Sequence, residues 1–87
     1  MATARALRHP SGMPDANAML GRVIRRLRTE RGISQEGLAA ISGIDRTFMG
    51  EIERGEANPS FDVLQRIASG LKVRLSELIQ QYETENK

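Results

Sequence analysis

The stretch from residue 34 to residue 55 decides the fold of this 87-residue chain, and it reads SQEGLAAISGIDRTFMGEIERG. Apolar residues recur in it at the three- and four-residue spacing of helices, first before Gly43 and then after it. Gly43 allows the chain to reverse direction between the two segments, because glycine adopts a positive φ without a Cβ penalty. The stretch therefore predicts two short helices joined by a tight turn, with apolar faces formed by Leu38, Ala39, Ile41, Phe48, Met49 and Ile52.

The starts of these two helices carry capping residues. Ser34 precedes the first helix and Asp45 precedes the second, and the side-chain oxygen of either residue can accept a hydrogen bond from a free backbone N–H. In a helix-turn-helix of this kind the second helix faces outward, and its dimensions suit the major groove of DNA. We therefore expect the segment 45–54 to be a DNA-reading helix.

The composition limits the kind of protein that this chain forms. Apolar residues make up 39% of it, with only two Phe and one Tyr, so the core must be largely aliphatic. Because the chain has no cysteine, one histidine, no metal-ligand cluster and no glycine-rich phosphate loop, we expect neither an enzyme nor a bound metal or cofactor. No apolar run approaches the ~20 residues of a membrane span, and the N-terminus lacks the apolar segment of a signal peptide. These features favour a cytoplasmic protein that does not enter membranes.

Charge is distributed unevenly along the chain. Residues 1–31 carry seven arginines against two acidic residues, whereas residues 32–87 carry six basic residues against nine acidic ones. Residues 1–16 are small and polar and are interrupted by two prolines and a glycine, which predicts a disordered basic arm. Arg5 and Arg8 of this arm could reach DNA, although a solvated tail is the simpler interpretation.

Three further helices are predicted around the central pair. The first spans residues 17–31, a fourth begins after the N-cap Ser60, and a fifth begins after the N-cap Ser76. The chain is thus expected to be an all-α domain of five helices over residues 17–82, followed by a polar tail at 83–87. The apolar positions that we expect to face the core in the first and fourth helices are Leu20, Val23, Ile24, Leu27, Phe61, Leu64, Ile67, Ala68 and Leu71.

An ordered series of short motifs resembles one known family. The motifs are Leu20-Gly21, Ile24-Arg25, Leu27-Arg28, Gly32-Ile33-Ser34-Gln35, Leu38-Ala39, Ser42-Gly43-Ile44, Ile52-Glu53-Arg54-Gly55 and Asn58-Pro59-Ser60. Their order is similar to that of the phage repressor/Cro-type (XRE) helix-turn-helix family of DNA-binding transcriptional regulators. The segment from Asp45 to Gly55 also resembles the small controller proteins of restriction–modification systems. The resemblance implies a lambda-repressor-like fold and double-stranded DNA as the partner.

The resemblance also assigns roles to individual residues. Arg28 and Glu53 match a structural ion pair that ties the first helix to the end of the third, and Gln35 matches a glutamine that contacts a DNA phosphate. Arginine can donate two hydrogen bonds to guanine O6 and N7, and the threonine methyl group can pack against a thymine methyl. The positions that match base-reading residues are Arg46, Thr47, Gly50 and Glu51, and those that match residues near the DNA backbone are Arg54 and Asn58.

The last helix is the expected dimer interface. Leu75, Leu78, Ile79 and Tyr82 are apolar positions on a helix that closes the bundle, and part of this surface has no further helix to cover it. Two copies related by a twofold axis would bury it and would place their reading helices about one DNA turn (~34 Å) apart. We therefore expect a homodimer on a pseudo-palindromic operator. The alternative is that these residues only complete the monomer core.

A second functional class stays open. The segment 45–56 contains two arginines against four acidic residues, which opposes binding to a polyanion. Glu51 can accept a hydrogen bond from cytosine N4, or it can be a solvated helix charge. The alternative function is a helix-turn-helix scaffold that binds a partner protein, as an antitoxin does, with weak or no DNA binding. The arginine-rich first helix, Gln35 and Arg46 favour DNA, and salt-dependent binding to random duplex DNA would separate the two classes.

Overall fold

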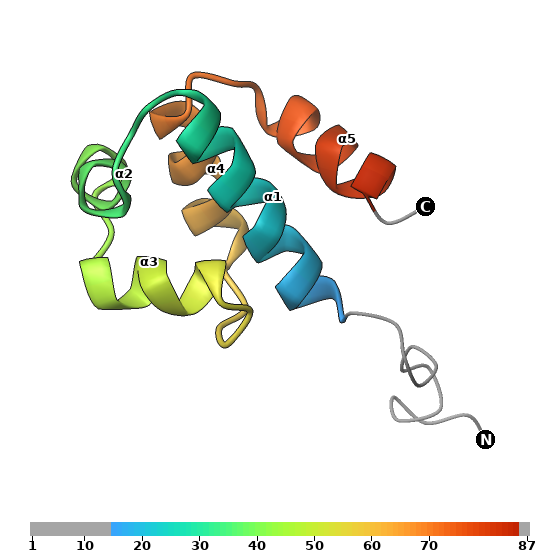
Figure 1. Cartoon of the computed structure of the whole chain (residues 1–87), viewed down its shortest axis with the longest axis horizontal. Helices are drawn as coiled ribbons and strands as arrows, with labels where there is room; N and C mark the ends of the chain where they lie inside the picture. The colour runs from blue at the N-terminus through green and yellow to red at the C-terminus, as the bar shows by residue number, and fades with distance from the viewer. Residues whose placement is uncertain (1–14, 86–87) are drawn as a thin grey trace.

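This computed structural model describes residues 15–85 of the chain. These residues form five helices joined by turns and loops (Figure 1). The predicted all-α class is confirmed, since these residues contain no strand. The basic arm predicted for residues 1–16 lies outside the described residues, except for its last two, which start the first helix. The helices are α1 (Ala16–Glu30), α2 (Gln35–Ser42), α3 (Arg46–Glu53), α4 (Phe61–Gly70) and α5 (Leu75–Glu85).

Side-chain caps define where four of the helices begin. Each cap accepts a hydrogen bond from the backbone N–H three residues later, at 2.7 to 3.2 Å. These N–H groups have no partner inside the helix, so the cap satisfies a donor that would otherwise depend on water. The caps predicted at Ser34, Asp45 and Ser60 are confirmed, and the cap of α1 is Asp15.

The start of α5 differs from the prediction. Ser76 is not its cap, because the helix already includes Leu75. Glu77 instead accepts a hydrogen bond from the backbone N–H of Arg74 at 2.8 Å. A carboxylate in the first turn of the helix therefore satisfies the N–H of the residue that precedes it. The helix also continues to Glu85, past the boundary expected at residue 82.

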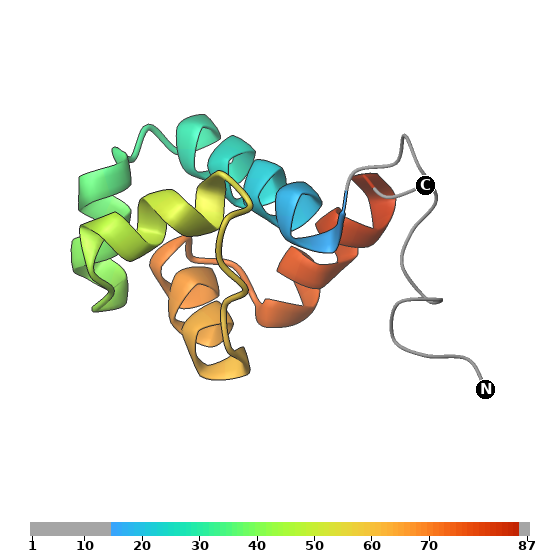
Figure 2. The ribbon, with the colours of Figure 1, turned by 90° about the horizontal axis from the view of Figure 1, so that it is seen from below.

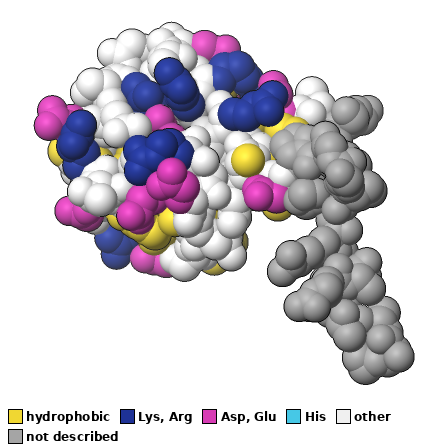
Figure 3. All heavy atoms as spheres, turned by 60° about the horizontal axis from the view of Figure 1, so that its bottom comes forward, with side chains coloured by type: hydrophobic (Ala, Val, Ile, Leu, Met, Phe, Trp, Pro, Cys, Tyr) yellow, Lys and Arg dark blue, Asp and Glu magenta, His cyan; other side chains and the backbone are white. Residues whose placement is uncertain are grey.

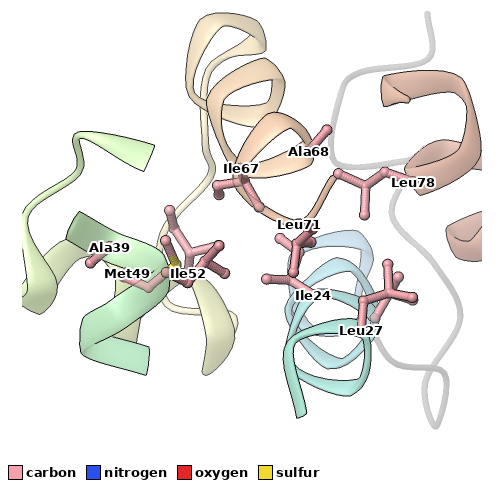
Figure 4. Packing of buried hydrophobic residues seen from close by; sticks show 11 residues of the cluster. Ile24, Leu27, Ala39, Met49, Ile52, Ile67, Ala68, Leu71 and Leu78 are labelled. Carbon is pink, nitrogen blue, oxygen red and sulfur yellow. The ribbon is translucent and has the colours of Figure 1, made fainter. Parts of the chain in front are cut away.

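Helix α1 occupies the middle of the domain. It packs against α3 on one side and against α5 on the other, and α2 packs against both α3 and α4 (Figures 1 and 2). All five helices contribute to the core that this arrangement encloses (Figure 4). The core is aliphatic, as predicted, and consists of Val23, Ile24, Leu27, Leu38, Ala39, Met49, Ile52, Ile67, Ala68, Leu71 and Leu78.

Two predicted core residues are exposed instead. Ile41 has a relative exposure of 64% and Phe61 of 67%. The short helix α2 buries one narrow side, which carries Leu38 and Ala39, and Ile41 points away from it. Phe61 is the first residue of α4, and Figure 2 shows the first turn of this helix projecting at the edge of the domain. The spacing of apolar residues predicts the helices themselves. It does not predict which part of each helix is covered by a neighbouring helix.

Glycines allow α1 to approach the C-terminal end of α3 closely. A Cβ at Gly21 would overlap the backbone carbonyl oxygens of Ile52 and Glu53. Gly55, with φ of +77°, turns the chain immediately after α3, and a Cβ there would lie 2.7 Å from Ala18 Cα. The opposing atoms are backbone, which cannot rotate away as a side chain can. The position of α3 relative to α1 therefore depends on these small residues.

Substituting Gly21 with alanine tests this close approach. We expect Gly21→Ala to lower the free energy of unfolding by about 3 kcal/mol, because the new methyl group meets backbone atoms that must move. Gly32→Ala is the matched control, since Gly32 has φ of +67° with no atom within 4 Å of an added Cβ. It should cost only about 1 kcal/mol, from the backbone strain alone. Urea unfolding measures the free energy of unfolding of both variants. Equal decreases in the two variants would contradict the close approach of α1 to α3.

Candidate nucleic-acid interface

A tight turn sets α3 against α2. Gly43 ends α2 in the left-handed conformation, with φ of +68°, as the sequence predicted. The backbone N–H of Gly43 donates to the carbonyl of Ala40 at 3.2 Å, and that of Ile44 donates to the carbonyl of Ala39 at 2.9 Å. These bonds satisfy the last carbonyls of α2 while the chain reverses. The two helices and this turn form a helix-turn-helix.

Helix α3 has one buried side and one exposed side. Met49 and Ile52 are buried in the core, with 0% and 1% exposure. Arg46 and Thr47 are exposed on the other side, and Glu51 is half-buried. The helix is therefore held by its inner face and leaves long polar side chains free to contact another molecule.

A buried ion pair joins α1 to the C-terminal end of α3. Arg28 Nε lies 2.7 Å from Glu53 Oε2, and Arg28 Nη2 donates to Glu53 Oε1 at 3.0 Å. The side chains are only 12% and 3% exposed, respectively. Arg28 Nη1 also donates to the backbone carbonyl of Ile33 at 2.9 Å, and Gln35 Nε2 donates to Glu53 Oε1 at 3.1 Å. One network therefore connects α1, the α1–α2 turn, the start of α2 and the end of α3.

Sequence reasoning found only part of this network. The resemblance pointed to Arg28 and Glu53, but it gave Gln35 a contact with DNA and no contact inside the protein. The sequence does not predict the bond to the carbonyl of Ile33, because no side-chain pattern indicates a backbone acceptor. Gln35 lies 18 positions from Glu53 in the sequence, and the bond between them depends on how α2 packs on α3.

Gly50 is buried, although the family pattern placed it among the exposed reading positions. The side chains of Arg54 and Gln35 lie over it: an added Cβ would be 3.0 Å from Arg54 Nη1 and 3.4 Å from Gln35 Oε1. Glycine offers no side chain to read a base. The absence of a side chain at Gly50 instead leaves room for the side chains of Arg54 and Gln35 to lie over α3.

The exposed arginines at the ends of α3 are paired with acidic residues. Arg46 Nε lies 3.7 Å from Glu36, and Arg54 makes two hydrogen bonds of 3.1 Å to the carboxylate of Glu56. The hydrogen bond and the charge of Glu56 raise the pKa of the Arg54 guanidinium above its usual value. Figure 3 shows basic and acidic side chains interspersed over this face of the molecule. Exposed ion pairs of this kind are weak, so another anion can compete for either arginine.

The remaining predicted site residues lie toward α5. Asn58 is exposed and lines a groove of about 140 Å³ together with Leu20, Ile79 and Tyr82. Ile79 is 37% exposed, and Leu75 and Tyr82 are half-buried. Leu78, which was predicted at a dimer interface, has 0% exposure because it is part of the monomer core.

In residues 15–85, no helix is both long and apolar enough to cross a membrane. The same residues contain no group of three His, Cys, Asp or Glu side chains that could hold a metal ion.

The turn between α2 and α3, with the outer face of α3 left free, defines a helix-turn-helix domain. The family model described as Helix-turn-helix matches residues 24–78, and the chain belongs to this family. The XRE-type resemblance found in the sequence is thereby confirmed.

Relatives and solved structures agree with this assignment. The chain is 39% identical over 74 residues to the control protein C.MunI of Mycoplasma sp, covering 84% of this chain and 100% of the relative. It is 41% identical over 61 residues to the regulator SlrR of Bacillus subtilis, covering 69% of this chain but only 40% of SlrR. The restriction–modification controller protein C.AhdI of Aeromonas hydrophila is similar in structure, with a TM-score of 0.69 and 41% identity over 70% of this chain and 92% of its own. The controller protein C.Esp1396I, whose structure was solved as a tetramer on its operator, gives a TM-score of 0.76 and 33% identity over 80% of this chain and 92% of its own.

A double-mutant cycle on Arg28 and Glu53 tests the buried network. Either Arg28→Met or Glu53→Leu alone should cost about 3 kcal/mol or more, because each leaves the other charge buried without its partner. The double variant should lose much less than the sum, which gives a coupling free energy above about 1 kcal/mol in chemical unfolding. Losses that add within about 0.5 kcal/mol would show that the two side chains do not depend on each other.

The pair Asp62–Arg66 provides the matched control for this cycle. Its atoms lie 3.1 Å apart, but the side chains are 69% and 52% exposed. The same cycle on this pair should give a coupling below about 0.5 kcal/mol, because water screens exposed charges.

Proposed function

We propose that this chain is a sequence-specific DNA-binding transcriptional regulator that works as a homodimer and reads a pseudo-palindromic operator with α3. The observation that carries the proposal is the placement of α3, whose inner face is held by the core and by Glu53 while Arg46 and Thr47 face solvent. Family membership supports this function, and so does the similarity to C.Esp1396I, a protein solved on its operator. A regulator of this kind would act in the cytoplasm.

Base reading would use the exposed side of α3. The Arg46 side chain is 64% exposed and is held only by Glu36 at 3.7 Å, so it can turn to guanine O6 and N7. The methyl group of Thr47 can pack against thymine. Glu51 is half-buried and can accept from cytosine N4 at the edge of the same surface. Arg54 and Asn58 would lie near the sugar–phosphate backbone.

Gln35 would have two roles. Its amide has two N–H donors, and one of them is used by Glu53. The other can donate to a phosphate beside the first turn of α2, where backbone N–H groups already favour an anion. The same side chain would thus fix the helices relative to one another and anchor the DNA.

The dimer would form through the exposed side of α5. Leu78 faces the monomer core, so the surface consists of Leu75, Ile79 and Tyr82, beside the groove that Leu20 lines. Association about a twofold axis would bury these residues in both copies. It would also align two α3 helices with successive major grooves, about 34 Å apart.

A helix-turn-helix that binds a partner protein is the second candidate. The observation in its favour is that Glu36 and Glu56 pair with Arg46 and Arg54, which lowers the positive potential of the reading surface. A DNA-binding protein must show affinity for random duplex DNA that falls as salt rises. A protein-binding scaffold would show no such affinity.

The variant Arg46→Ala tests the reading surface. After selection of an operator from random duplexes, Arg46→Ala should weaken operator binding by about 1–3 kcal/mol and relax the preference at one base pair. Arg66→Ala is the control, since Arg66 is also exposed and paired but lies on α4. Fluorescence anisotropy on operator and random DNA measures both. If Arg46→Ala bound operator and random DNA as tightly as the wild type does, the exposed side of α3 would not be the reading surface.

Sedimentation tests the dimer. Wild-type protein should be dimeric at tens of micromolar, and Ile79→Glu with Tyr82→Glu should be monomeric because two charges would be buried per copy. Gln80→Glu adds a charge to an exposed position of the same helix and should leave the dimer intact. Circular dichroism verifies that each variant is folded. A monomeric wild type that binds a palindrome without cooperativity would contradict the dimer.

A further inference from the structure

A second hollow lies on the side of the domain opposite α3. It measures about 410 Å³ and is lined by Arg31, Ile33, Ile41 and residues 69–72. These residues come from the C-terminal ends of α1 and α4, from the turns that follow these two helices, and from α2. Figure 1 shows the ends of α1 and α4 at the top of the domain and α3 at the bottom. A molecule in this hollow would therefore leave the reading surface free.

An exposed apolar side chain stands at the edge of the hollow. Ile41 is 64% exposed, and it also borders a neighbouring hollow on the α4 side. Gly70 and Leu71, both buried, form part of the lining of the hollow. Gly70 lets α4 pack closely on α2, since a Cβ there would lie 2.7 Å from Ser42 Oγ and 3.0 Å from Leu38 Cδ1. The hollow thus combines an exposed apolar rim with a floor of backbone and buried aliphatic groups, which suits an apolar side chain of another molecule.

Lys72 occupies a strained position at the rim. It is the one residue other than glycine with a positive φ in the described chain, at +62°. Its N–H donates to the carbonyl of Ser69 at 3.0 Å, and the N–H of Val73 donates to the carbonyl of Ala68 at 3.0 Å, which closes the end of α4. Glycine is the favoured residue here. A lysine at a position that favours glycine is a backbone outlier, which makes its side chain a candidate for a functional role.

The rim carries positive charge that the protein does not neutralise. Within residues 15–85, no carboxylate forms an ion pair with Arg31 or Lys72. Arg31 Nη1 instead donates to the backbone carbonyl of Leu27 at 3.3 Å. In the neighbouring hollow, by contrast, Arg66 is paired with Asp62. Arg31 and Lys72 therefore line one apolar hollow without a carboxylate partner among residues 15–85, and the complementary ligand has an apolar group between carboxylates.

We propose that this hollow is a docking surface for an acidic amphipathic peptide segment of a partner protein. An apolar side chain of the segment enters beside Ile41, and its carboxylates pair with Arg31 and Lys72. Such a contact goes beyond DNA reading. Because the hollow lies on the side away from α3, the partner and the DNA bind at the same time.

The test uses the full chain, labelled with 15N, and the synthetic peptide EELLDELLEE. Binding should shift the amide resonances of Ile41 and residues 69–72 and should weaken as salt rises. Ile41→Ser and Lys72→Gly should each weaken binding roughly tenfold. Lys72→Gly should also raise the melting temperature, because glycine relieves the positive φ, and this separates lost binding from lost folding. The controls Phe61→Ser and Arg26→Gln alter an equally exposed apolar residue and a paired arginine that do not line this hollow, and they should bind as the wild type does.

Four results would overturn the proposal. The first is the absence of binding at about 1 mM EELLDELLEE. The second and third are that the basic peptide KKLLKKLLKK, or the peptide EESSDESSEE without apolar residues, binds as tightly as EELLDELLEE. The fourth is that the Ile41 and Lys72 variants bind EELLDELLEE with the affinity of the wild type. Random duplex DNA that shifts the same resonances and displaces the peptide would assign the surface to nucleic acid instead. A complex with the selected operator should bind the peptide within about twofold of the free protein. This last arm rests on the proposed DNA-binding function, whereas the peptide titration without DNA does not.

Discussion

The buried contact between Arg28 and Glu53 holds α3 in a single orientation against α1. The carboxylate of Glu53 is almost fully withdrawn from water, so its charge must be compensated by the protein. Arg28 supplies two hydrogen bonds and Gln35 a third, which joins three helices at one point. A buried ion pair adds little net stability, but it penalises any arrangement that separates the partners. The orientation of α3 follows from this requirement.

The same chemical pairing has a different effect on the surface of α3. Arg46 and Arg54 also meet carboxylates, but water reaches both partners, so the contacts hold the side chains only loosely. Because they are loosely paired, Arg46 and Arg54 can exchange their carboxylate partners for a phosphate or a base edge. Arg28 could not exchange Glu53 in this way without disrupting the fold. Burial alone thus separates an arginine that builds the domain from arginines that are available to a ligand.

The central position of α1 separates the surfaces of this small domain. Because α3 and α5 pack on opposite sides of it (Figure 2), the exposed side of α3 and the exposed side of α5 belong to different surfaces. The C-terminal ends of α1 and α4 leave a third surface, around Lys72, which shares no lining residue with the groove beside Ile79. DNA, a second copy and a partner segment would therefore not compete for the same residues.

Five helices, most of their caps, the turn at Gly43 and the aliphatic core could all be predicted from the residues alone. These features depend on spacing along the chain and on local backbone chemistry, which the residues display directly. The covering of Gly50, the exposure of Ile41 and the bond from Gln35 to Glu53 could not be predicted in this way and are seen only in the packed domain. Each of these outcomes depends on which helix lies over which face, and that is set by contacts between residues far apart in the sequence.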